Sequence, residues 1–210
     1  MKHLRIVCLL VVLSAATAAV SQGSNPAPAA KPATPAPQAQ GAPQPPTTIA
    51  ALVERQVSVS EKQIVEAAEA MPEDKYNFSP ESLNIPGSDY KGVRTFAMEV
   101  KHIATANFAF WTPLTGDPLP ASIKGPNGPD ELKTKAEIIK FLKDSYAAGH
   151  KAAATVTSEN FMEAVTFRTG KAPRIYLALN GPSHANDHYG QMVEYLRMNG
   201  IVPPASRTAN

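Results

Sequence analysis

The sequence has 210 residues, which is enough for one domain of ordinary size with additional segments. Its formal net charge of +2 equals the contribution of Lys2 and Arg5, and no basic stripe or aromatic-interleaved basic run is present, so we expect no nucleic-acid partner. The only cysteine, Cys8, lies in an apolar N-terminal run, so histidine and carboxylate side chains must supply any metal ligands in the rest of the chain.

The N-terminal segment has the pattern of a secretory signal peptide. Two basic residues precede a continuously apolar run over residues 6–13, and small residues follow it. The small-x-small pattern predicts cleavage after Ala18, with Ala19-Val20-Ser21 as an alternative site. We therefore predict a signal peptide over residues 1–21 and an exported protein, periplasmic or secreted. The apolar run is shorter than the roughly 20 residues of a membrane span, so membrane attachment is expected only if this leader stays uncleaved.

Residues 22–48 form a linker that is rich in proline and alanine. They contain almost no charge and no aromatic residue. Such a composition cannot bury enough apolar surface to offset the entropy that is lost on ordering. We therefore predict a disordered linker with a polyproline bias.

The remaining domain, residues 49–206, carries four stretches with apolar residues at helical spacing. We predict helices over residues 49–71, 92–111, 133–156 and 172–199. Thr134, followed three residues later by Glu137, predicts a capping box at the start of the third helix.

Proline and glycine predict where the helices end. We expect Pro113 to stop the second helix, Gly181-Pro182 to break or kink the fourth, and Gly200 to end it. Residues 112–132 are rich in proline and predict a long irregular connection. Because no alternating apolar run is long enough to argue for a sheet, the predicted fold class is all-α, a four-helix bundle.

His184 and His188 are the clearest local signal for chemistry. Residues four apart share one face of a helix, so both imidazoles can reach one ion. Two incidental surface histidines would have the same spacing, and spacing alone leaves both interpretations open. Zinc proteases place a catalytic glutamate directly after the first histidine, but this sequence has Ala185 there, so the protease mechanism fails.

His102 in the second predicted helix is the candidate third ligand. Its neighbours on that face of the helix are short or polar, which suits a cleft between helices; a solvent-facing histidine is the alternative interpretation. Glu99 and His102 form a Glu-x-x-His pair like those of di-iron bundles, but no second pair is aligned with it, so a di-metal oxidase is disfavoured. Glu99 remains a candidate fourth ligand or general base.

Two other polar residues are interpreted more simply. His150 has no histidine or carboxylate partner three or four residues away that would suggest a metal pair, so we interpret it as a surface or packing residue. Ser183 beside His184 resembles a nucleophile–base pair, but adjacent helix residues face apart and no nucleophile-elbow motif surrounds them. A serine hydrolase is therefore disfavoured.

Three blocks of this sequence resemble the DinB/YfiT-like superfamily: MPEDKYNFSP from residue 71, VKHIATAN from residue 100, and HANDHYGQMVEYLRMNGIVPPAS from residue 184. The resemblance covers residues 50–206. It implies a four-helix bundle with one long crossover connection and a divalent metal, often nickel, zinc or manganese. It also implies that His102, His184 and His188 are the ligands. Members of this superfamily include metal-dependent transferases and isomerases that use low-molecular-weight thiols. The resemblance also implies that this chain can form a homodimer through its bundle faces.

Three histidine ligands leave at least one coordination position of an ion open, as catalytic sites do. The leading hypothesis is therefore a metal-dependent hydrolase or transferase that acts on a small molecule, with Glu99 or Asp187 as proton acceptor and Gln191 close to the ligands. The competing hypothesis is a non-catalytic metal-binding or stress-related bundle. A third is a structural helical module whose histidines are incidental.

Overall fold

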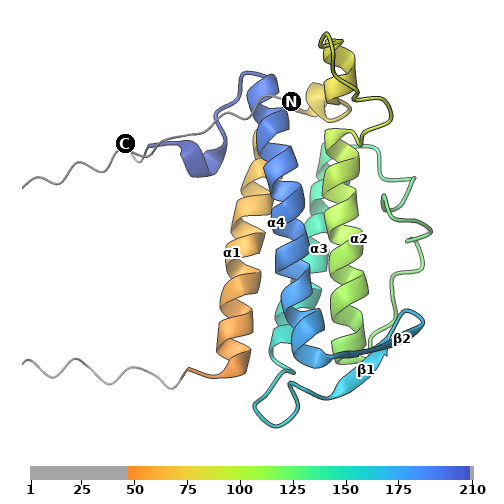
Figure 1. Ribbon diagram of the computed structural model, residues 1–210, viewed down its shortest axis with the longest axis vertical. Coiled ribbons are helices and arrows are strands. Elements are labelled where there is room, and N and C mark those ends of the chain that lie inside the picture. The colour runs from red at the N-terminus through yellow and green to blue at the C-terminus, as the bar shows by residue number, and fades with distance from the viewer. Residues whose placement is uncertain (1–46, 209–210) are drawn as a thin grey trace, which may run out of the picture. The chain divides into compact units, whose positions relative to one another are not determined.

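The computed structural model describes residues 47–208, and the predicted signal peptide and residues 22–46 of the predicted linker lie outside this range. Four helices make up most of the described chain (Figure 1). They are α1 (Ile49–Ala70), α2 (Phe96–Thr115), α3 (Lys135–Ala153) and α4 (Arg174–Met198). Together they form the four-helix bundle that the sequence predicts. Among the described residues, no helix combines the length and the apolar character needed to cross a bilayer.

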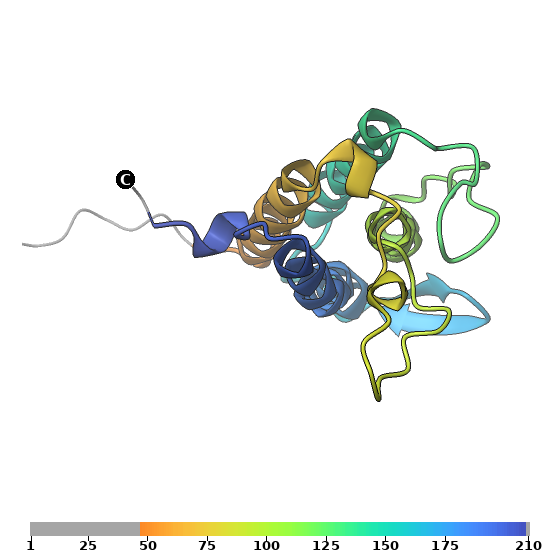
Figure 2. The same cartoon turned by 90° about the horizontal axis from the view of Figure 1, so that it is seen from above.

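The order of the helices around the bundle differs from their order in the chain. Both α1 and α2 pack against α3 and α4, so α1 and α2 occupy opposite corners of the bundle. In Figure 1, α2 and α3 run in one direction, and α1 and α4 run in the other. Residues 116–134, between α2 and α3, therefore travel along the outside of the bundle, as Figure 2 also shows. They form the long crossover connection that the family resemblance implies.

A threonine caps the start of each of the first three helices. Thr48, Thr95 and Thr134 each accept a hydrogen bond from a backbone N–H in the first turn, at 3.1, 3.3 and 3.3 Å respectively. Glu137 accepts a hydrogen bond from the Thr134 N–H in return, at 2.9 Å, which confirms the predicted capping box. Thr95 also sets the start of α2 at Phe96, four residues later than predicted. Each such cap contributes about 1 kcal/mol to helix stability.

The prediction that Pro113 stops the second helix is wrong, because α2 continues through it to Thr115. Proline removes one N–H donor, but the following residue, Leu114, is buried and holds the last turn against the core. Gly116 then ends the helix with a φ of +77°, and its N–H donates to the Thr112 carbonyl.

Of the break or kink predicted at Gly181-Pro182, the break is wrong, because α4 is one helix through Pro182. In a regular helix the N–H of residue 182 would donate to the carbonyl of Ala178, but proline has no N–H. The indole Nε1–H of Trp111 in α2 donates to that carbonyl instead, at 3.3 Å. A side chain from a neighbouring helix therefore satisfies the acceptor that proline leaves free, and α4 continues beyond the proline.

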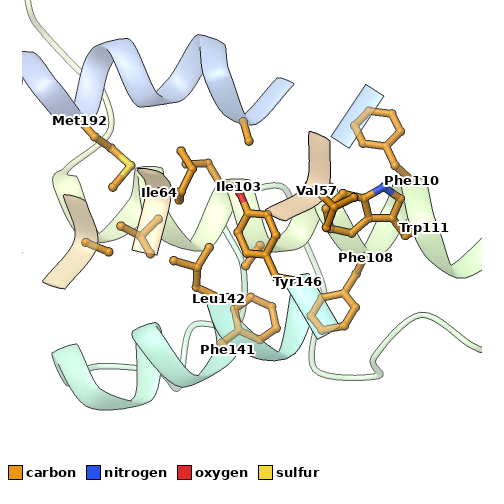
Figure 3. Close-up of a cluster of buried hydrophobic side chains, with 14 of the residues drawn as sticks. Val57, Ile64, Ile103, Phe108, Phe110, Trp111, Phe141, Leu142, Tyr146 and Met192 are labelled. Carbon is orange, nitrogen blue, oxygen red and sulfur yellow. The ribbon is translucent and has the colours of Figure 1, made fainter. Parts of the chain in front are cut away.

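Two glycines make room for the same indole. An added Cβ would lie 2.5 Å from the Trp111 ring at Gly149 of α3, and 2.3 Å from it at Gly181 of α4. Both distances are far below van der Waals contact, so only glycine lets α3 and α4 approach the ring this closely. Figure 3 shows Trp111 in the core, near Phe108 and Phe110.

The core is formed by large apolar side chains from all four helices (Figure 3). Fully buried examples are Val57 and Ile64 of α1, Ile103 of α2, Leu142 of α3 and Met192 of α4. This continuous packing makes the bundle a rigid frame, which fixes where side chains on the facing helices meet.

Residues 164–173 form a β-hairpin that the sequence analysis did not predict. β1 (Ala164–Phe167) and β2 (Gly170–Pro173) pair antiparallel, with Phe167 opposite Gly170. Strands of four residues are too short for an alternating pattern to be distinctive. The Phe167 ring stacks on Phe110 of α2 at 5.5 Å between centroids, and Phe110 contacts the His184 ring edge to face at 5.9 Å. Phe110 therefore contacts both the hairpin and His184, one of the predicted metal ligands.

His150 of α3 bridges two glutamates of α1. Its Nδ1 lies 2.7 Å from Glu54, and its Nε2 lies 2.9 Å from Glu61. Burial of the ring lowers its pKa, but the hydrogen bonds that the ring donates to the two carboxylates, together with their negative charges, outweigh burial, so the pKa of His150 is raised above its ordinary value. The residue predicted to be on the surface or in packing is thus a polar clamp between two helices.

Replacing His150 with glutamine is expected to lower the free energy of unfolding at acid pH but not at alkaline pH. A histidine whose pKa is higher in the folded state stabilises the folded state, and this contribution is complete below the unfolded pKa, near 6.5. The contribution is lost as the pH rises through the folded pKa. We expect a loss of only about 0.5–1 kcal/mol, because the ring is partly exposed. Urea unfolding of both proteins at about pH 5.5 and pH 8.5 measures it. A loss of equal size at both values would contradict the clamp.

Candidate metal centre

Three histidines from two helices converge on one point. His102 comes from α2, and His184 and His188 lie one turn apart on α4. One ring nitrogen from each lies within 4.8 Å of the other two. The ring centroids are 4.6 to 5.0 Å apart. The structure therefore brings together the three residues predicted as ligands, close enough to share one ion.

The pairing of α2 with α4 explains this convergence. The two helices pack side by side and run in opposite directions (Figure 1), so the start of α2 faces the end of α4. Near that end, the Tyr195 hydroxyl donates to the carbonyl of Arg94 at 3.0 Å. Further along the pair, Phe110 contacts His184. His102 lies between these two contacts in the chain and is thereby placed opposite the histidine pair of α4.

The crossover connection holds the His102 ring. Its Nδ1 lies 2.6 Å from the carbonyl oxygen of Pro126. A carbonyl oxygen can only accept, so Nδ1 carries the proton and Nε2 keeps its lone pair. His102 is thus fixed in the tautomer that binds a metal through Nε2.

Glu99 faces Nδ1 of His188, as the Pro126 carbonyl faces Nδ1 of His102. Its Oε2 is 2.7 Å from His188 Nδ1, and the two side chains are only 2% and 7% exposed. The distance is that of a hydrogen bond, but the two atoms are not aligned as one, so the contact is mainly electrostatic. A carboxylate at this place favours a proton on Nδ1 and leaves Nε2 for a metal. Glu99 is not one of the converging ligand atoms, so the structure places it as a partner of His188.

The surroundings favour the neutral form of two of these imidazoles, His102 and His184. Burial, and then the charges of the neighbouring histidines, lower the pKa of His184 to about 4. Burial also lowers the pKa of His102, although the Pro126 hydrogen bond opposes the effect. A neutral imidazole is the form that binds a metal. Within the described residues, His184 Nδ1 is buried without a hydrogen-bond partner, which fits a site that accommodates a cation.

The segment Pro126–Pro129 of the crossover connection packs closely on α2 next to His102. Lys101 is 8% exposed, and its Nζ donates to the Pro129 carbonyl at 3.1 Å. Gly128 has a φ of +78°, and a Cβ added to it would lie 2.8 Å from Lys101 Cβ. The left-handed backbone and the close approach both require glycine. Gly128 thereby helps to set the place of the Pro126 carbonyl on His102.

Gly128→Ala is expected to weaken metal binding about tenfold, because it displaces the carbonyl that orients His102. Loss of such an orienting contact typically costs about 10–100-fold in metal affinity. Gly125→Ala is the matched control in the same connection, since nothing lies within 4 Å of a Cβ added there. Competition against a chromophoric chelator measures both affinities. Equal values for the two variants would contradict the orienting role of this segment.

The remaining predicted site residues are exposed. Asp187 and Gln191 lie on the solvent side of α4, and within residues 47–208 neither side chain makes a hydrogen bond. The charge of Asp187 nevertheless acts on His184. The contact between Pro126 and His102 was not predictable from the sequence, because proline and glycine indicate a tight turn but not which residue the turn contacts.

Comparison with known proteins agrees with the four-helix fold and with the family that the sequence resembles. The family model described as DinB superfamily matches residues 56–192. Among solved structures, the chain is similar to a DinB-like protein from Bacillus cereus ATCC 10987, with a TM-score of 0.57 and 15% sequence identity over 75% of this chain and 96% of that one. At this identity the likeness shows the fold alone. No curated protein matches the chain.

Proposed function

The chain belongs to the DinB superfamily, and from this premise we propose that it holds one divalent transition metal at His102, His184 and His188 and uses it as a hydrolase or transferase on a small substrate. The observation that carries the proposal is the convergence of three buried or half-buried imidazoles from two helices. Incidental surface histidines would not be expected to meet at one point.

The donor set fits a transition metal. Imidazole nitrogens suit nickel and zinc, and the described chain offers no thiolate. Two of the three rings have a partner on Nδ1, namely the Pro126 carbonyl and the Glu99 carboxylate. Such contacts orient ligands and raise their basicity. Nickel, zinc and manganese are the candidate ions that family likeness suggests.

Three protein ligands leave room for a substrate or water on the ion. When bound, such an ion polarises a substrate oxygen and lowers the pKa of a coordinated water toward neutrality. Pro126 and Glu99 orient two of the ligand rings, those of His102 and His188. Asp187 is an exposed carboxylate near His184 and is the candidate proton acceptor. Ala185 stands where a zinc protease has its glutamate, so peptide cleavage by that mechanism is not proposed.

The proposed place of action is outside the cytoplasm, because residues 1–21 have the pattern of a leader. Export separates the protein from cytoplasmic thiols. Water is then the more available second substrate, which favours hydrolysis over thiol transfer.

The test is a measurement of metal content together with thermal unfolding. Protein purified without chelators is expected to contain one nickel, zinc or manganese ion per chain by mass spectrometry. Chelator treatment should lower the melting temperature, and adding back the ion should restore it, because an ion that binds only the folded state stabilises it by about 2.7 kcal/mol at 100 times Kd. Protein free of these ions, with a melting temperature that none of them changes, would overturn the proposal.

A non-catalytic metal-binding bundle is the second candidate. In this alternative the protein binds the same metal through the same three histidines but catalyses no reaction. Bound metal at one ion per chain without turnover of any ester, amide or phosphate ester in a broad substrate panel would favour it.

A further inference from the structure

We propose that Arg94 forms an anion subsite beside the metal centre, so that the substrate carries a carboxylate group. The inference rests on the proposed function, because it concerns the ligand of the same site. Arg94 directly precedes Thr95, the residue that caps α2. The predicted metal ligands and proton acceptors do not include this arginine.

Two side-chain contacts place Arg94 beside the histidines. Its Nη1 lies 4.0 Å from Glu99, the carboxylate whose other oxygen is 2.7 Å from His188. Its Nε donates to the side-chain oxygen of Asn127 at 2.8 Å. Asn127 directly follows Pro126, the residue whose carbonyl contacts His102. Two adjacent residues of the crossover connection therefore fix the guanidinium and a metal ligand relative to each other.

The backbone of Arg94 is fixed as well. Tyr195 of α4 donates its hydroxyl to the Arg94 carbonyl at 3.0 Å. The arginine is thus held at its main chain and at Nε, on the same pair of helices that supplies the three histidines. The positive charge also acts on the centre, since it contributes to the lowered pKa of His102 and His184.

The terminal nitrogens of Arg94 remain available. Within residues 47–208 neither donates a hydrogen bond, and the ion-pair contact of Nη1 with Glu99 is 4.0 Å long. Other ion pairs of this protein are much shorter, such as Lys143 with Glu69 at 2.7 Å and Lys151 with Asp117 at 2.6 Å. A guanidinium that served only to neutralise Glu99 would be expected at such a distance. Arg94 is also 31% exposed where Glu99 is 2% exposed, so it lies on the solvent side of the centre.

The charge of the loaded centre favours an anion. The guanidinium of Arg94 offsets the charge of the neighbouring Glu99 carboxylate, so a doubly charged ion held by the three imidazoles would keep a net positive charge beside it. A carboxylate could bind the ion with one oxygen or lie beside it while receiving hydrogen bonds from Arg94. The planar fork of a guanidinium matches the two oxygens of a carboxylate, which makes a small organic acid the ligand class that this chemistry recognises.

The experiment titrates acetate into cobalt-loaded protein in carboxylate-free buffer and follows the visible spectrum of the cobalt ion. Acetamide, which has the same shape without the charge, is titrated in parallel. Wild type is expected to bind acetate at least tenfold more tightly than acetamide. Arg94→Gln should weaken acetate binding about 10–100-fold, the usual range for a lost hydrogen bond to a charged group. It should leave acetamide binding and cobalt stoichiometry unchanged.

Two variants separate the roles of the side chain. Arg94→Lys keeps the charge without the fork and is expected to give an intermediate acetate affinity. Arg197→Gln removes an exposed arginine of α4 that contacts Ser206, away from the centre, and should behave as wild type.

Each outcome decides one claim. Cobalt at one ion per chain with equal acetate affinity in wild type and Arg94→Gln would overturn the anion subsite alone. Loss of cobalt in Arg94→Gln would also overturn it, because Arg94 would then serve the ligands through Glu99. Failure of the wild type to bind cobalt would overturn the proposed function and the subsite with it.

Discussion

Replacing His188 with alanine is expected to abolish stoichiometric metal binding. The substitution removes one of three imidazoles, and the remaining two come from different helices and make a poor site. After dialysis against buffer with trace metal, mass spectrometry should find one ion per chain in the wild type and almost none in the variant. His150→Ala is the matched control, because it removes a half-buried histidine from another helix and should keep the ion. Equal metal in wild type and His188→Ala would end the three-histidine centre.

His188→Ala should also lower the stability of the metal-free protein. Glu99 is 2% exposed and would lose its close contact with His188. Leaving a buried polar group without its partner costs about 1–3 kcal/mol, and more when the group is charged. The double variant Glu99→Gln, His188→Ala is therefore expected to recover part of this loss in urea unfolding. No recovery would indicate that the cost comes from the lost packing of the ring.

Gly181→Ala is expected to destabilise the bundle by about 1–3 kcal/mol, the usual cost of overpacking. The new Cβ would lie 2.3 Å from the Trp111 ring, so α4 or the indole must move. Gly190 lies on the exposed side of the same helix, with nothing within 4 Å of an added Cβ. Gly190→Ala should therefore stabilise by about 0.5–1 kcal/mol, because alanine favours a helix interior over glycine. The two substitutions are chemically identical and are expected to have opposite signs.

A double-variant cycle tests the cause. In a Trp111→Phe background the smaller ring leaves space, so Gly181→Ala should cost less than it does in the wild type. An unchanged cost would show that the indole is not what the new methyl group meets.

The fold was largely predictable because its signals are local. Helical spacing located four helices, and Thr134 with Glu137 marked the start of α3. The hairpin was not predictable in the same way, since its strands are four residues long. The two internal prolines were misjudged for a different reason. Whether Pro182 breaks a helix depends on a donor from Trp111, 71 positions away in the numbering of the chain, and no local pattern contains that information.

The candidate site was predictable in its members but not in its surroundings. The i, i+4 spacing indicated His184 and His188, and family likeness supported His102 as the third ligand. The contacts that orient them come from the Pro126 carbonyl and from the tertiary placement of Glu99. A backbone carbonyl has no signature in the sequence, and a long irregular connection can lie against any face of the bundle. Arg94 was overlooked because its role depends on that same connection.

The protein has a single tryptophan, and its ring lies 1% exposed where α2, α3 and α4 meet. All tryptophan fluorescence of the protein therefore arises from one buried side chain, and no engineered label is needed. The emission maximum should shift to longer wavelength when the bundle unfolds. The Trp111 indole proton, which is engaged with the Ala178 carbonyl, should likewise give one well-separated resonance in a proton NMR spectrum. That carbonyl lies six residues before His184 on the same helix. A change in the chemical shift of this resonance during a zinc titration would therefore show that metal binding at His184 alters the packing of α4 on Trp111.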